Sequence, residues 1–187
     1  KRNKLAIELG DVPQFDNFDT ALKQTNPDIV SINSYTETHK EFAIKSLNNG
    51  AHVFIEKPLA ENIKDAKEII DLALNKNKKI VVGYILRHHP TWKKFINLSQ
   101  GLGSPLVMRM NLNQQSSEEQ WEIHKNLMKS TSPIVDCGVH YVDIMCQMTK
   151  SKPVYVNAIG VNLTDEIKND MYNYGHLQIT FENGSVG

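Results

Sequence analysis

The sequence predicts an α/β domain followed by an α+β domain, and a change of pattern along the chain indicates this order. In the first half, short apolar segments alternate with stretches of helical periodicity, which is typical of a parallel sheet with right-handed crossovers. In the second half, apolar and polar residues alternate in twos, as in an antiparallel sheet. The segment GLGSP at 101–105 separates the two patterns. We therefore predict domains at residues 1–101 and 102–187.

Three segments of the first half have the composition of buried parallel strands. They are mostly apolar and β-branched, and they occupy residues 28–34, 52–56 and 79–85. Such strands are expected to be covered on both faces. Helical patterns at 37–50 and 61–76 connect them, and the second pattern carries apolar residues on one side and charge on the other. A further helix is expected at 91–100, before the domain boundary.

Three segments of the second half alternate side chains with a period of two and lie near turn residues. They occupy residues 105–113, 153–162 and 175–185. No long helical pattern lies between the last two segments, so we predict that they belong to an antiparallel sheet.

Composition excludes several classes of function. Lys plus Arg and Asp plus Glu each number 21, so the chain has no basic footprint for nucleic acid or an anionic membrane. The longest apolar run, at 80–86, is too short to span a bilayer. We expect a cytoplasmic protein that has no nucleic-acid or membrane partner.

Lys57 is the first candidate catalytic residue. It ends the apolar stretch VFIEK and is followed at once by Pro58. Strand ends in α/β proteins are where ligands bind. A salt bridge, a hydrogen bond to a substrate oxygen and a Schiff-base amine are all compatible with this position. The spacing alone leaves the three roles open.

A second candidate lies in the segment 132–145. Asp136, His140 and Asp143 fall at i, i+4 and i+7, so in a helix they share one face. An Asp one turn before a His can orient the imidazole, which takes up a proton near neutral pH. The alternative is an Asp that complements the helix dipole and a His that is bonded locally. Spacing alone favours this alternative.

Metal ligation has little support in the sequence. His140, Asp143 and the pair His88-His89 carry suitable side chains, but they form no cluster at ligand spacing. The cysteines Cys137 and Cys146 match no metal or redox motif. We predict no metal site.

The candidate segments occur together in one known family. AHVFIEKPLAENIKDA (51–66) followed by DCGVHYVDIM (136–145) resembles the glucose-fructose oxidoreductase, inositol dehydrogenase and MocA (Gfo/Idh/MocA) family of NAD(P)-dependent oxidoreductases. SINSYTETHKEFAIKSLNNGAHV is similar to the family's strand, turn and helix, with Tyr35 where Pro is usual. VVGYILRHHPTW and GLGSPLVMRM are similar to its next strand and to the passage into its second domain.

The resemblance implies a partial Rossmann-type parallel sheet followed by an α+β domain with an open-faced antiparallel sheet. It also implies a homo-oligomer, a dimer or tetramer formed through that second sheet. The sequence contains no Gly-x-Gly-x-x-Gly loop. We therefore expect the chain to be truncated at both ends relative to the family.

The resemblance assigns roles to particular residues. Asp136 and His140 match the catalytic pair, and Lys57 would lie near the nicotinamide and the reacting oxygen. A small-molecule substrate and NAD or NADP as cofactor are implied. The cofactor-lining residues would be Ser34, Tyr35, His39, Glu56 and Lys57. The candidate substrate contacts are Arg87, Trp121 and His124, and packing is an equal alternative for Trp121 and His124.

The implied activity is hydride transfer between nicotinamide and a sugar, polyol or related hydroxy compound. A non-catalytic ligand-binding or regulatory protein on the same fold is the alternative. A Schiff-base lyase that uses Lys57 is a third hypothesis. The resemblance also favours a cis bond between Lys57 and Pro58.

Overall fold

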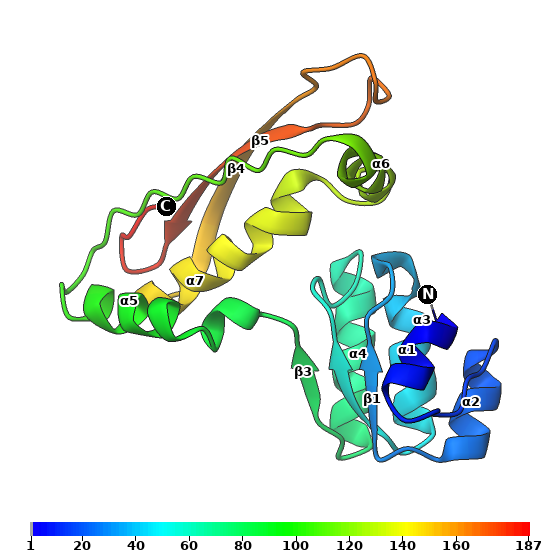
Figure 1. The fold of residues 1–187 in the computed structure, drawn as a ribbon. Helices are drawn as coiled ribbons and strands as arrows, with labels where there is room; N and C mark the ends of the chain where they lie inside the picture. The colour runs from blue at the N-terminus through cyan, green and yellow to red at the C-terminus, as the bar shows by residue number, and fades with distance from the viewer. Residues whose placement is uncertain (1) are drawn as a thin grey trace. The chain divides into compact units, whose positions relative to one another are not determined.

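The computed structural model describes residues 2–187, and the chain divides into two compact units (Figure 1). Unit 1 ends at Gly83, and unit 2 runs from Tyr84 to Gly187. The predicted boundary at 101–102 therefore falls inside unit 2. The reason is that helix α5 (Pro90–Gln100), expected in the first domain, packs against helix α7 (Val139–Thr149) of unit 2. Within residues 2–187, no helix combines the length and apolar character needed to cross a membrane.

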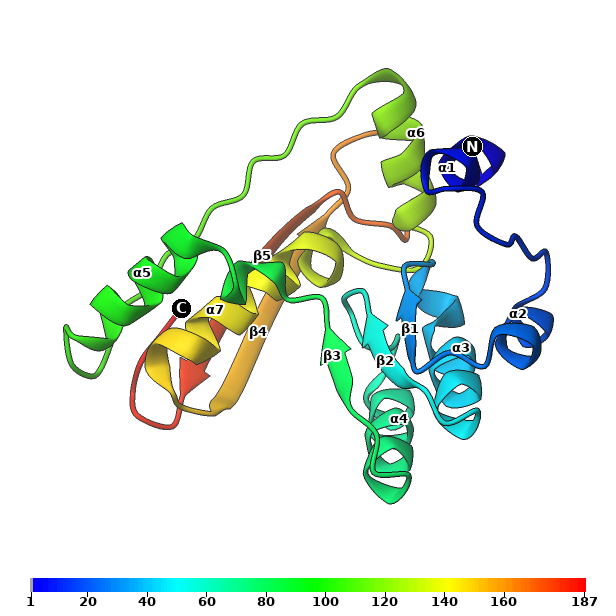
Figure 2. The ribbon, with the colours of Figure 1, turned by 60° about the horizontal axis from the view of Figure 1, so that its bottom comes forward.

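Unit 1 contains a three-stranded parallel sheet in the order β1-β2-β3, as the sequence predicts (Figure 2). Its elements are α1 (Arg2–Glu8), α2 (Phe18–Thr25), β1 (Ile29–Ile32), α3 (Thr36–Asn48), β2 (His52–Ile55), α4 (Ile63–Asn75) and β3 (Ile80–Val82). Helix α4 begins at a side-chain cap, because Asn62 Oδ1 accepts a bond of 2.9 Å from the Asp65 amide. Asn17 caps α2 in the same way through the Thr20 amide.

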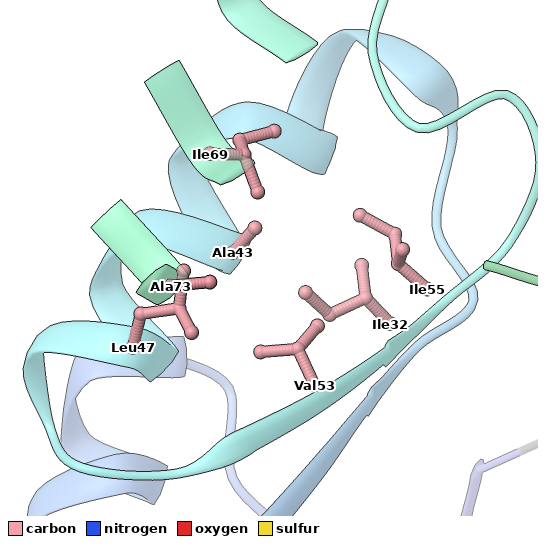
Figure 3. Close-up of a cluster of buried hydrophobic side chains, with 7 residues drawn as sticks. All are labelled: Ile32, Ala43, Leu47, Val53, Ile55, Ile69 and Ala73. Atoms are coloured by element: carbon pink, nitrogen blue, oxygen red, sulfur yellow. The ribbon is translucent and has the colours of Figure 1, made fainter. Parts of the chain in front are cut away.

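The core of unit 1 lies between the sheet and helices α3 and α4 (Figure 3). Val53 and Ile55 are two positions apart on β2, so they point to the same face, and both are buried. The other members of this core are Ile32, Ala43, Leu47, Ile69 and Ala73. Helices α3 and α4 therefore cover one and the same face of the sheet.

The expected coverage of both faces is not found in the described residues. Ile29 and Val81 remain 66% and 51% exposed. The strands follow one another across the sheet in a single direction, and crossovers between parallel strands are almost always right-handed. Two such crossovers place both connecting helices on the same side, so the described strands are covered on one face only.

Unit 2 contains a two-stranded antiparallel sheet with helices packed on it. Its elements are η1 (Ile85–Arg87), α5, α6 (Glu118–Leu127), the π-helical turn η2 (Ile134–Gly138), α7, β4 (Pro153–Val161) and β5 (Tyr174–Phe181). Ile144 and Met145 of α7 pack with Ile179 and Phe181 of β5. Strand β4 is exposed along its whole length, so the sheet has an open face, as expected.

The strand predicted at 105–113 was wrong. This segment is extended but pairs only through an isolated parallel bridge between Val107 and Val186. The Met108 amide donates to the Val186 carbonyl at 2.9 Å, and the Val186 amide donates to the Leu106 carbonyl at 2.9 Å. Met108 is buried in the core whereas Val107 is 87% exposed. The alternating pattern thus reflects burial of one side of an extended segment. Such burial does not require the segment to be paired along its length with a neighbouring strand.

Candidate functional site

Unit 1 presents polar side chains where its parallel strands end. Ser34 and Tyr35 follow β1, Glu56 and Lys57 follow β2, and Gly83 follows β3. Because the strands are parallel, their carboxyl ends meet at the same edge of the sheet. Four of the five predicted cofactor-lining residues therefore lie in the turns at one sheet edge.

Gly83 makes room for the carboxylate of Glu56. A Cβ atom at Gly83 would lie 3.1 Å from Glu56 Oε2 and 3.2 Å from Cδ. The same Oε2 accepts a bond of 3.2 Å from the Lys57 amide. The bond between Lys57 and Pro58 is cis, which confirms the prediction. The turn that carries Lys57 is therefore packed against the end of β3 through Glu56.

His39, the fifth predicted cofactor-lining residue, is buried and joins two of these turns. Its Nδ1 lies 2.8 Å from the Pro58 carbonyl oxygen, and its Nε2 lies 3.1 Å from the Ser34 carbonyl oxygen. The side chain is 1% exposed. Both partners are acceptors only, so the ring nitrogen that carries the proton is the one that donates. His39 thus connects the turn after β1 with the turn after β2.

Unit 2 carries Asp136 and His140 on consecutive turns of one helical segment. Asp136 lies in η2, where its amide donates to the Ser132 carbonyl at 2.8 Å, and His140 lies at the start of α7. The His140 ring meets the Tyr84 ring edge-on, with centroids 6.3 Å apart. Single π-helical turns are frequent at functional sites. The wider turn changes the relation of Asp136 to α7 from the one expected for an uninterrupted α-helix.

Asp143 has a different environment from the one expected. Its carboxylate is 9% exposed and accepts two bonds from the Arg87 guanidinium, with Nε to Oδ2 at 2.8 Å. This hydrogen bond raises the pKa of Arg87, and burial raises the pKa of Tyr84, whose ring lies 5.0 Å from the guanidinium carbon. The carboxylate of Asp143 is therefore engaged by Arg87, and a polar face shared by Asp136, His140 and Asp143 stays a prediction. A substrate contact by Arg87 stays a prediction.

A cavity of about 480 Å³ lies within unit 2 and brings together predicted residues from separate parts of the sequence. Trp121 and His124 from α6 line it together with Asp136. The Trp121 indole nitrogen donates to Glu166 Oε2 at 2.7 Å. Glu166, also in the lining, was missed by the sequence reasoning, since no local motif marks it and it lies 45 residues from Trp121.

The described residues offer no alternative metal centre. Within residues 2–187, no three His, Cys, Asp or Glu side chains come together as a metal-binding group. The polar turns at the sheet edge of unit 1 fit a dinucleotide better, because the crevice outside the carboxyl ends of parallel strands is where such ligands bind.

A parallel α/β unit followed by a unit with an open antiparallel sheet defines a protein of the Rossmann type with a second, α+β domain. The profile described as "Oxidoreductase family, NAD-binding Rossmann fold" matches residues 1–84. The profile described as "GFO/IDH/MocA C-terminal domain" matches residues 93–187. The chain therefore belongs to the Gfo/Idh/MocA oxidoreductase family.

Curated relatives of this chain include sugar and polyol dehydrogenases. UDP-N-acetylglucosamine 3-dehydrogenase of Acidithiobacillus ferrooxidans is 28% identical over 85% of this chain and 46% of its own length. Inositol 2-dehydrogenase of Salmonella typhimurium is 25% identical over 76% of this chain and 40% of its own length. The chain thus spans less than half the length of these relatives.

Solved structures share the fold over nearly the whole chain. The inositol dehydrogenase homologue from Azotobacter vinelandii, in complex with NAD+, has a TM-score of 0.83 at 18% identity, covering 99% of this chain and 52% of that one. The UDP-N-acetylglucosamine 3-dehydrogenase structure from Acidithiobacillus ferrooxidans has a TM-score of 0.73 at 25% identity, covering 98% and 55%.

Proposed function

We propose that this chain belongs to an NAD(P)-dependent oxidoreductase that transfers a hydride between nicotinamide and a hydroxyl-bearing carbon of a sugar or polyol. The observation that carries the proposal is the position of Asp136, which lines the cavity of unit 2 one turn before His140. Membership of an NAD-binding oxidoreductase family supports the same conclusion. The relatives named for inositol and UDP-N-acetylglucosamine support a substrate that carries ring hydroxyls.

In the proposed reaction, the substrate loses one proton from its hydroxyl group and one hydride from the carbon that carries it. His140 accepts the proton of the reacting hydroxyl, and Asp136 orients the imidazole for that transfer. Lys57 donates a hydrogen bond to the oxygen as negative charge develops on it. Bound NAD+ or NADP+ supplies the acceptor for the hydride that leaves the same carbon. In the reverse direction, His140 returns the proton to the alkoxide oxygen.

The cofactor site would use the sheet edge of unit 1. Ser34, Tyr35 and Glu56 lie in its turns, and Gly83 leaves room for the Glu56 carboxylate there. His39 would contribute by fixing the turns around Ser34 and Pro58 rather than by direct contact, because its ring is buried against their carbonyl oxygens. Either NAD or NADP is compatible with these residues.

The test is turnover by the complete protein. Inositols and neutral sugars would be supplied with NAD+ or NADP+, and the absorbance of the reduced nicotinamide would be followed. We expect reduction with at least one substrate, and loss of it in His140→Ala but not in the control His88→Ala. Ligand binding without turnover would instead support the non-catalytic alternative, and borohydride trapping of a substrate on Lys57 would support the lyase.

A homo-oligomer formed through the β4–β5 sheet is part of the same proposal. Strand β4 exposes Tyr155 and Ile159, which lie on the face opposite to the buried Ile179, by more than half of their surface, and apolar patches of this kind are typical of protein interfaces. Light scattering of the complete protein would measure the assembly state, and a monomeric mass would contradict the proposal. A cytoplasmic location stays a prediction from composition.

A further inference from the structure

The short turn η1 is attached to the rest of unit 2 by two of its three residues. The hydrogen bonds within a 3₁₀ turn are poor, so side-chain contacts decide where such a turn lies. Leu86 packs against the apolar core of unit 2. Arg87 donates from Nε to Asp143 Oδ2 at 2.8 Å and from Nη2 to Oδ1. This ion pair is the polar part of the attachment, and it joins η1 to α7.

The ion pair fixes the orientation of Arg87. Two parallel bonds to one carboxylate hold the plane of a guanidinium as well as its distance. The side chain of Asp143 is 8% exposed, whereas that of Arg87 is 43% exposed. Because carboxylates are almost never buried without a partner, the position of Asp143 in the packed face of α7 requires Arg87 to stay bound.

Tyr84 connects this ion pair with His140. The guanidinium carbon of Arg87 lies 5.0 Å from the centre of the Tyr84 ring, and the Arg87 amide donates to the Tyr84 carbonyl at 3.0 Å. The Tyr84 ring meets the His140 ring edge-on, with centroids 6.3 Å apart. Edge-on geometry is a preferred arrangement of aromatic pairs, so the Tyr84 ring favours one orientation of the imidazole.

The carboxylate of Asp143 is also a neighbour of His140 along α7. Asp143 follows His140 by three residues, and residues at this spacing lie next to each other on a helix surface. An ionised carboxylate near an imidazole stabilises the protonated ring. The guanidinium of Arg87 offsets that charge, so the pair presents little net charge to His140.

We propose that Arg87, Asp143 and Tyr84 are positioning residues for His140. The ion pair holds η1 on α7, and η1 in turn places the Tyr84 ring against the imidazole that exchanges the substrate proton. The role of His140 rests on the proposed oxidoreductase function, whereas the contacts among the four residues do not. In this role Arg87 acts through Asp143 and Tyr84, and direct contact of Arg87 with substrate is the alternative that the experiments separate.

The other titratable groups on the elements packed against α7 are the same in every variant that would be compared. They are Asp136 and Cys137 on η2, Lys93 and Lys94 on α5, and Tyr174 and His176 on β5. Differences among variants of Arg87 and Asp143 therefore report the ion pair.

The first experiment measures the pKa of the His140 imidazole by NMR titration of the complete protein without cofactor or substrate. The ring resonance of His140 is the one that is missing in His140→Ala. In Arg87→Gln the carboxylate of Asp143 loses its partner, so the pKa of the imidazole should rise by at least about 0.5 unit. In Asp143→Asn the carboxylate is gone, so this pKa should not rise, and the double variant should remove the rise. A folded Arg87→Gln protein with an unchanged imidazole pKa would overturn the inference.

The second experiment tests the attachment of η1 to α7. A nuclear Overhauser contact between the rings of Tyr84 and His140 is expected in wild type and should be weaker in Arg87→Gln. Ile179→Val is the matched control, because it removes a buried methyl group from the same core without changing a charge. The control should be less stable than wild type and should keep both the ring contact and the imidazole pKa. Equal weakening of the ring contact in the two variants would refute a specific role of the ion pair.

Turnover tests whether the Tyr84 ring, and not its hydroxyl group, positions the imidazole. Tyr84→Leu removes the ring, and we expect kcat to fall by at least about tenfold while KM changes by less than about threefold, because misplaced reacting groups lower the rate of the chemical step. Tyr84→Phe restores the ring and should recover most of the lost kcat. Equal losses in both variants would assign the effect to the hydroxyl group and contradict the proposal.

The remaining outcomes separate this inference from substrate binding by Arg87 and from the proposed function. An increase of KM with unchanged kcat in Arg87→Gln would indicate direct substrate contact and overturn the positioning role. Absence of nicotinamide reduction with every compound would refute the oxidoreductase. In that case the NMR titration and the ring contact would still decide whether the ion pair positions His140.

Discussion

Unit 1 and unit 2 hold their candidate site residues by different means. In unit 1 the side chains stand in turns at strand ends, and the turns are fixed by contacts to the backbone, such as His39 to the Pro58 and Ser34 carbonyls. In unit 2 the site lies along a helical segment and a cavity, and side chains fix side chains, as in the Trp121–Glu166 bond. Backbone contacts preserve a turn's path, whereas side-chain pairs depend on two particular residues far apart in the sequence.

From this difference we infer how substitutions in each unit affect the candidate site. A substitution in unit 1 is expected to alter catalysis only when it replaces the hydrogen-bond donor Lys57 or a residue that supports the turn carrying it. A change in unit 2 is expected to act through a partner residue, because removing one member of a buried polar pair leaves the other unsatisfied. Five experiments test this contrast between the two units.

The largest effect is expected for His140→Ala in the complete protein. Loss of the acid/base group should lower turnover by about 10² to 10⁴, because a positioned proton acceptor contributes that much. Cofactor affinity should stay unchanged, since the imidazole acts on the hydroxyl. Steady-state kinetics with calorimetric measurement of NAD(P) binding would check both. Full turnover in the variant would remove His140 from the mechanism.

Lys57→Arg tests the strand-end donor of unit 1. Arg keeps the charge, but its planar fork places its donors differently from an ammonium. We expect kcat to fall by about 10² to 10³, the usual cost of losing one donor to a developing oxyanion, with the fold retained. Kinetics and circular dichroism would measure the two outcomes. Near-normal kinetics would favour a salt-bridge role for Lys57.

His39→Ala tests the backbone support in unit 1. The variant removes a buried ring that contacts two carbonyl oxygens, so we expect a loss of about 2 to 4 kcal/mol in the free energy of unfolding. Amide hydrogen exchange should accelerate around Ser34 and Pro58 before it does so in unit 2. The exposed His88→Ala serves as control and should change stability by less than about 0.5 kcal/mol. Equal effects of the two variants would disprove the supporting role.

Asp143→Ala tests the side-chain support in unit 2. It leaves the Arg87 guanidinium without its carboxylate partner. Because the Arg87 side chain is 43% exposed, water hydrogen-bonds the guanidinium and replaces part of the lost interaction. We expect a destabilisation of about 1 to 3 kcal/mol, seen as faster exchange in α7. The exposed carboxylate Asp170→Ala is the matched control. If the destabilisations caused by Arg87→Ala and Asp143→Ala were fully additive in the double variant, the two residues would not be energetically coupled.

The smallest effect concerns a half-buried ion pair of unit 1. The hydrogen bond from Lys40, 2.6 Å long, is the main cause that lowers the pKa of Asp65. A carboxyl whose folded pKa is lowered stabilises the protein above its ordinary pKa of about 3.9, and this contribution is lost as pH falls through the folded value. Lys40→Gln should therefore be less stable than wild type near neutral pH, and the gap should close in acid. Urea titrations across this range would measure the gap, with Lys67→Gln as control.

The parallel sheet of unit 1 could be predicted because its signals are local. The predicted strand 52–56 and the observed β2 differ by one residue, and the segments at 28–34 and 79–85 both contain the observed strands. The segment at 105–113 failed because alternation describes which side is buried, and an extended segment with one bridge satisfies it as well as a strand does.

The candidate site could be predicted only in part. Trp121, His124 and Asp136 were selected from the sequence and line one cavity. Glu166 was missed, and the bond of Asp143 to Arg87 was not predicted, because Arg87 lies 56 residues away. Sequence spacing locates groups within one helix or turn. It carries no information about which distant residue will satisfy a buried carboxylate.

The bridge between Val107 and Val186 has a consequence for synthesis on the ribosome. The contacts within unit 1 join residues that all precede Tyr84 in the sequence. The Leu106 amide, by contrast, donates to Ser185 Oγ, 79 residues later. At about 5 to 20 residues per second, translation of that interval takes roughly 4 to 16 s. Met108 and the apolar face of α5 therefore lack their later partners for several seconds of translation, and a chaperone that protects the nascent protein would act on unit 2.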